Sequence, residues 1–139
     1  MNRQTLQLLA EERLKDADTL LAAGQWAGAH YLAGYAVECG LKACIMVRVV
    51  NEGLIFTDPK LVEKVWIHRL EPLLKMTGLE AAFGQACQAD GLLAVHWTTA
   101  MKWEETSRYL FKAEAEARDL TVAVGHPTSG MLQWLRKHW

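Results

Sequence analysis

The sequence predicts an all-α protein: an up-and-down bundle of five to six helices, led by a long antiparallel helical hairpin, with no sheet. Apolar residues recur at three- and four-residue steps along most of the chain, which is the spacing of a buried helix face. Valine and threonine nowhere alternate with polar residues over the length of a strand. Only Gly24 and Gln25 separate the first two helical patterns, and so short a connection makes these helices antiparallel neighbours.

Length and composition predict a single domain over residues 1–139. A domain of this size buries roughly two-thirds of its unfolded surface, so it needs no disulfide or metal to hold a core. The 15 basic and 16 acidic side chains give a formal net charge of −1, which excludes a polybasic coat that holds nucleic acid by charge alone. With 51% apolar and 22% charged residues, the composition also excludes a disordered chain.

The first predicted helix covers residues 3–23 and stops at Gly24. Its apolar stripe consists of Leu6, Leu9, Ala10, Leu14, Ala17 and Leu21. The second helix covers residues 26–52 and is apolar on most sides, which places it at the centre of the bundle or in a subunit interface. Because it carries more apolar surface than one bundle face covers, we predict a homodimer.

The remaining helices are shorter. Gly53 closes the second helix, and Asp58-Pro59 opens a third, with Asp58 as cap and Pro59 at the first helical position. In chain order, the next patterns cover residues 68–76, stopped at Gly78; residues 79–87, with a bend at Gly91 and a continuation through Met101; and residues 112–124. After a break at Gly125-His126-Pro127, Ser129 is placed to cap a last helix over residues 131–139.

Motifs for cofactors, metals and membranes are missing from the sequence. The three cysteines and five histidines have no metal-ligand spacing, and no GxGxxG, P-loop or GxSxG is present, so we expect no cofactor and no metal. No apolar signal-peptide core follows Met1, and the longest apolar tract has Glu38 and Lys42 at its midpoint. We therefore expect a cytoplasmic protein with no membrane contact.

Four stretches of the first two helices together resemble the opening hairpin of the HEPN domain (higher eukaryotes and prokaryotes nucleotide-binding). They are residues 13–21 (RLKDADTLL), 26–27 (WA), 31–38 (YLAGYAVE) and 41–43 (LKA). Weaker matches follow at His68-Arg69-Leu70, at Trp103 with Ser107-Arg108-Tyr109, and at residues 130–135 (GMLQWL). The resemblance implies a five- or six-helix bundle, usually dimeric, found in prokaryotes beside small nucleotidyltransferases or in toxin–antitoxin and defence systems.

Many members of that family are metal-independent ribonucleases that use an arginine followed four to six residues later by a histidine. No arginine here meets that spacing: Arg108 has Lys112, Ala113 and Glu114 at the three positions. We therefore predict no catalytic residue and a non-catalytic module that binds a nucleotide- or RNA-type anion or docks a nucleotidyltransferase partner. The alternative is a ribonuclease toxin whose site combines Arg108 with His68, His96 or His126.

Several polar residues are candidates for the ligand site, each with a plain structural interpretation beside it. Glu38 and Lys42 are four residues apart and form either a packing ion pair or part of a polar cleft. Lys102, Arg108 and Lys112, with Tyr109 among them, form either a solvated surface or a phosphate patch. His68 is either a core or turn-capping histidine or a ligand contact. Among the tryptophans, Trp26, Trp66 and Trp97 are assigned to the core or its edge, while Trp103, Trp134 and Trp139 either pack or stack on a base.

Overall fold

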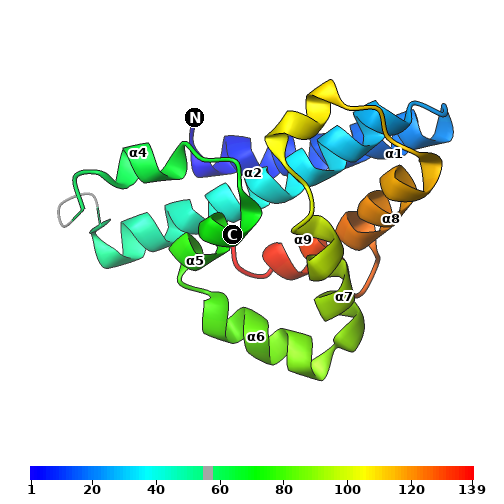
Figure 1. Ribbon diagram of the computed structural model, residues 1–139. Helices are drawn as coiled ribbons and strands as arrows, with labels where there is room; N and C mark the ends of the chain where they lie inside the picture. The colour runs from blue at the N-terminus through cyan, green and yellow to red at the C-terminus, as the bar shows by residue number, and fades with distance from the viewer. Residues whose placement is uncertain (55–57) are drawn as a thin grey trace.

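A computed structural model describes residues 1–54 and 58–139, and these residues are helical with no strand among them (Figure 1). The described part contains eight α-helices and one 3-10 helix, η1. In chain order they are α1 (Arg3–Ala22), α2 (Trp26–Glu52), α4 (Leu61–Val65), α5 (Leu70–Thr77), α6 (Glu80–Ala89), α7 (Gly91–Ala100), η1 (Glu105–Tyr109), α8 (Glu114–Gly125) and α9 (Met131–Leu135).

Helices α1 and α2 lie side by side and are joined by a turn at Gly24, whose φ of 73° is in the left-handed region that glycine adopts without strain (Figure 1). The side chain of Asn2 begins α1 by accepting a hydrogen bond from the Thr5 backbone N–H at 2.8 Å. The buried residues of α1 fall on the predicted stripe: they are Leu6, Ala10, Leu14 and Ala17. The apolar period of the sequence therefore identifies the face of α1 that packs against α2.

Helix α2 is the central element, since α1, α5, α8, α9 and η1 all pack against it. This confirms one of the two predicted positions for an apolar helix, the centre of a bundle. Most of its apolar residues are covered within a single chain, with Val50 near its C-terminal end exposed, so the apolar surface of α2 gives the homodimer prediction little support. Two glycines let neighbours approach the α2 backbone closely: a Cβ at Gly34 would lie 2.2 Å from the Trp103 ring, and one at Gly40 would lie 2.9 Å from Leu135.

Trp103 and Trp134 are core residues, with 2% and 6% of their surface exposed, so neither ring offers a face to a nucleic-acid base. Trp66 is 69% exposed, and its assignment to the core is wrong. The pattern around Trp66 contains Val62 and Val65, which imitate a buried stripe, but α4 has only five residues and buries none of them fully. A helix this short cannot cover a tryptophan on its own.

Several helix ends differ from the prediction. Helix α4 begins at Leu61, because the Asp58 side chain accepts a hydrogen bond from the Lys60 backbone N–H and forms a turn before the helix starts. Helix α5 begins at Leu70, two residues after His68. The caps explain the other differences: Asp90 accepts from Leu92 and Leu93 and starts α7 as a separate helix, while Gly130, not Ser129, precedes α9, which ends at Leu135. These breaks raise the number of helices above the expected five to six.

Candidate functional site

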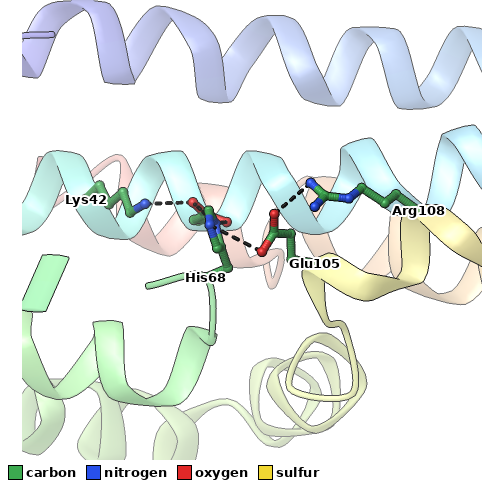
Figure 2. A network of polar contacts seen from close by, with 5 residues as sticks. Lys42, His68, Glu105 and Arg108 are labelled. Carbon is green, nitrogen blue, oxygen red and sulfur yellow. Dashed lines mark hydrogen bonds and ion pairs between the residues drawn. The ribbon is translucent and has the colours of Figure 1, made fainter. Parts of the chain in front are cut away.

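Five charged or titratable side chains form one continuous chain of contacts along α2, which we call the α2 network (Figure 2). Its members come from three separate parts of the sequence: Glu38 and Lys42 from α2, His68 from the segment before α5, and Glu105 and Arg108 from η1. Lys42 and Arg108 lie at its two ends in the close-up view. The fold thus joins four of the seven sequence candidates, namely Glu38, Lys42, His68 and Arg108.

Glu38 is the buried centre of the network, with only 2% of its side chain exposed. Its Oε1 accepts a hydrogen bond from Lys42 Nζ at 2.7 Å, and its two carboxylate oxygens lie 3.0 and 3.1 Å from His68 Nδ1. A buried carboxylate is costly unless charged or hydrogen-bonded partners surround it. The Lys42 ammonium and the His68 ring supply those partners to the Glu38 carboxylate.

His68 is held between two carboxylates. Its Nδ1 faces Glu38, and its Nε2 lies 3.3 Å from Glu105 Oε2. Since an ionised carboxylate only accepts hydrogen bonds, the contact with Glu38 places a proton on Nδ1. Glu38 fixes the ring orientation and directs Nε2 towards η1. The side chain is 37% exposed, so the ring also reaches solvent.

Arg108 completes the network from η1, where it lies three residues after Glu105. Its Nη1 is 2.6 Å from Glu105 Oε1, and the guanidinium carbon lies 4.9 Å from the centre of the Tyr109 ring. Hydrogen bonds to Tyr109 and then to Tyr31 raise the pKa of Arg108 above its ordinary value, so the guanidinium stays charged. The side chain is 42% exposed, which leaves the remaining N–H groups open to a ligand.

The Glu105 carboxylate consequently lies between an imidazole and a guanidinium, one oxygen on each. Arginine, lysine and protonated histidine all bind phosphate oxygens through charge-assisted hydrogen bonds. Glu105 is 28% exposed, so the place that its carboxylate occupies can be reached from solvent. In this arrangement two nitrogen-bearing side chains hold the protein's own carboxylate at a place that solvent reaches.

The other three candidates lie outside the network. Lys112 Nζ is 3.2 Å from Glu116 and lies near His30, whose pKa is lowered to about 4 by burial and further by the Lys112 charge. Lys102 is exposed and has no ion-pair partner within residues 1–54 and 58–139, and Tyr109 is 75% exposed. Arg108 and Lys112 do not share a helix face because the chain is extended at Leu110 and Ala113, between η1 and α8.

Sequence reasoning missed Glu105, which it treated only as a counter-charge on the surface. The one available signal is its spacing of three residues before Arg108, which puts both on one side of a short helix. Glu114, considered from its spacing as a carboxylate beside Arg108, pairs instead with Arg118 at 2.7 Å.

Two further histidines of the ribonuclease alternative bind backbone groups elsewhere in the fold. His96 Nδ1 lies 2.7 Å from the Ser129 carbonyl oxygen, and His126 Nδ1 accepts a hydrogen bond from the Ser129 backbone N–H at 3.1 Å. Their ring centres are 5.3 Å apart, between α7 and the connection from α8 to α9. Within the described ranges neither ring contacts Arg108, so His68 is the histidine that shares a site with it.

In the part of the chain that the structure describes, no group of three or more His, Cys, Asp or Glu side chains is arranged to hold a metal ion. No helix among residues 1–54 and 58–139 has the length and apolar character to cross a membrane. Comparison of the chain with protein-family models, with curated proteins and with solved structures gives no match. The HEPN resemblance therefore stays a prediction from the sequence.

Proposed function

We propose that this chain is a cytoplasmic, homodimeric HEPN-like module that binds a nucleotide- or RNA-type anion at His68 and Arg108 without cleaving it. In this proposal the helices form an up-and-down bundle led by the antiparallel pair α1 and α2. The proposal includes the docking of a nucleotidyltransferase partner in a toxin–antitoxin or defence-type system, which is the setting that the sequence resemblance implies.

The observation that carries the proposal is the position of the Glu105 carboxylate, with one oxygen 3.3 Å from His68 Nε2 and the other 2.6 Å from Arg108 Nη1. Two oxygens of a phosphate can accept hydrogen bonds from the same two donors that hold the two oxygens of this carboxylate. A phosphate also carries more negative charge than a carboxylate, so it competes well for the same two donors once Glu105 turns out towards solvent.

Calorimetry with ATP, GTP and short RNAs tests the anion site. We expect Arg108→Ala to abolish the binding heat and Glu105→Gln to strengthen binding several-fold, because the glutamine is uncharged and no longer competes for both donors. The matched control is Arg118→Ala, which removes an exposed arginine paired with Glu114 at 2.7 Å on α8 and should leave binding unchanged. Binding should also weaken steeply with salt, since phosphate contacts release counterions. If no probe gives a heat that Arg108→Ala removes, the site is wrong.

A second candidate is the ribonuclease, and one observation favours it: the buried Glu38 carboxylate orients His68 through Nδ1 beside Arg108. In such a site the histidine Nε2, once unprotonated and free of Glu105, would take the proton of an RNA 2′-hydroxyl. The 2′-oxygen would attack phosphorus, the 5′-oxygen would leave with a proton from water, and Arg108 would stabilise the negative charge. The products would be a 2′,3′-cyclic phosphate and a 5′-hydroxyl.

Incubation with a mixed RNA pool in EDTA distinguishes the two candidates. We expect no specific cleavage by the wild-type protein, because no arginine in the sequence is followed four to six residues later by a histidine, and a His68 Nε2 that donates to the bound phosphate cannot accept the 2′-hydroxyl proton. Metal-independent cleavage that is lost in both His68→Asn and Arg108→Ala would establish the ribonuclease instead. For the oligomeric state, light scattering should give twice the chain mass of 15.6 kDa, and a particle of the chain mass itself at micromolar concentration would exclude the homodimer.

A further inference from the structure

An apolar cavity lies at the end of the α2 network opposite to Arg108. Figure 1 shows α4 beside the start of α1 and the C-terminal half of α2, and side chains of these three helices line a cavity of about 310 Å³. The residues that define it are Leu6 from α1, Lys42, Ile45 and Val49 from α2, and Val65 and Trp66 from the α4 segment. All of them except Lys42 offer mainly carbon atoms.

Lys42 has the one charged side chain among the described residues of this lining. Its side chain is only 13% exposed, and its ammonium carries three N–H bonds, of which one donates to Glu38 Oε1 at 2.7 Å. The other two N–H bonds have no acceptor among the described residues. A mostly buried ammonium with unused donors on a residue that lines an apolar cavity is suited to bind a negatively charged head group that enters it.

We propose that this cavity binds a small amphiphilic carboxylate, with the alkyl chain among Leu6, Ile45 and Val49 and the carboxylate on the Lys42 ammonium. Glu38 does not depend on Lys42 alone, because His68 Nδ1 also lies within hydrogen-bond distance of its carboxylate. Glu38 therefore keeps a hydrogen-bond partner when the Lys42 ammonium also binds a ligand. The volume is at the lower end of the range for small-molecule pockets, roughly 300–1,000 Å³, which fits one short alkyl chain. This site takes a different class of ligand from the anion site at Arg108 and lies at the opposite end of the same network.

Calorimetric titration of the full chain with octanoate and with 1-octanol, both below their aggregation limits, tests the proposal. The two probes have the same chain length and differ in the charge of the head group. Octanoate should bind at least about tenfold more tightly than octanol, because the alcohol oxygen can accept a hydrogen bond from the ammonium but carries no negative charge. Acetate, which lacks the alkyl chain, should give no measurable heat at the same concentration.

Two neighbouring valines provide a matched pair of variants. Val49→Glu places a carboxylate in the cavity and should abolish octanoate binding, whereas Val50→Glu changes a residue that is 76% exposed on the same helix and should leave it unchanged. Lys42→Met should bring octanoate and octanol to equal affinity, with the fold of each variant checked by its helical circular dichroism. Equal binding of the two probes to the wild type, binding that survives Val49→Glu, or no octanoate binding at millimolar concentration would overturn the proposal.

Discussion

Gly34→Ala tests how the core positions the anion site. Gly34 lies in the middle of α2, directly under the indole ring of Trp103, and an added Cβ would lie 2.2 Å from two ring atoms. Ordinary van der Waals contact begins at 3.4 Å, so the ring would have to move by about 1.2 Å. Trp103 is 2% exposed and packs against Gly34 and Tyr31 of α2, so no open space can accept that movement.

The size of the effect follows from two opposing contributions. Replacing glycine by alanine inside a helix gains about 1 kcal/mol of helix propensity. Forcing a methyl group into a close-packed core costs roughly 1–3 kcal/mol, and losing the packing of a buried tryptophan costs roughly 3–5 kcal/mol. The displacement needed here is large, so we expect a net loss of about 2–4 kcal/mol in the free energy of unfolding. Because Trp103 precedes η1 by two residues, Glu105 and Arg108 should also move away from His68, and anion binding should weaken.

Urea unfolding followed by helical circular dichroism measures the change, with Gly84→Ala as the matched control. A Cβ at Gly84 meets no heavy atom within 4 Å, and Gly84 is an exposed residue inside α6. The control should therefore gain about 0.5–1 kcal/mol from helix propensity alone. If Gly34→Ala were as stable as the wild type, the close contact between Trp103 and the α2 backbone would be wrong, and with it the account of how η1 is positioned.

Two further predictions concern acid stability. Burial lowers the pKa of His30 to about 4 from 6.5, so the folded state resists its protonation, and stability should be lost as the pH falls from about 6.5 to about 4. At 1.36 kcal/mol per pKa unit this loss is at most about 3 kcal/mol, and urea unfolding of His30→Leu should show a correspondingly flatter pH dependence than the wild type. For Glu11, the hydrogen bond from Arg136 lowers the pKa below 4.5, so its stabilising effect is complete above that pH and lost as the pH falls through the folded value. The Glu11 and Arg136 side chains are both about one-third exposed, so solvent screens their attraction. Glu11→Gln should therefore lower the free energy of unfolding by less than about 1 kcal/mol at pH 7, and a larger loss would show that the pair is not screened.

Much of the fold can be predicted from the sequence because local signals specify it. The three- and four-residue apolar spacing identifies the buried face of α1, and Gly24 and Gly78 both adopt the left-handed conformation at the helix ends where the sequence places them. The errors occur where a competing local interaction decides the boundary. Asp58 forms a turn with Lys60 and delays α4, and Asp90 caps α7 and ends α6 where the sequence predicts only a bend at Gly91.

The candidate site is only partly predictable, since its contacts join residues far apart in the sequence. Glu38 and Lys42 can be paired from their spacing of four residues on one helix, and the structure confirms that contact at 2.7 Å. His68 reaches Glu38 across 30 residues, and no periodic signal links the two. For Lys112 the spacing suggests a contact that the fold does not make. Lys112 and Arg108 would share a face if one helix contained both, but the backbone is extended at Leu110 and Ala113, so no helix connects them.

The charge balance of the α2 network determines which ligand the Arg108 end favours. Lys42 and Arg108 balance Glu38 and Glu105, so the charge that His68 carries decides whether the network is neutral or positive. An incoming anion has to replace Glu105, which already satisfies both donors, and a monoanion gains little from such an exchange. A phosphate brings greater charge and additional acceptor oxygens, and it leaves Glu105 free to be hydrated at the surface. If the site binds anions as proposed, its occupation by the protein's own carboxylate would favour phosphate-type anions over simple carboxylates.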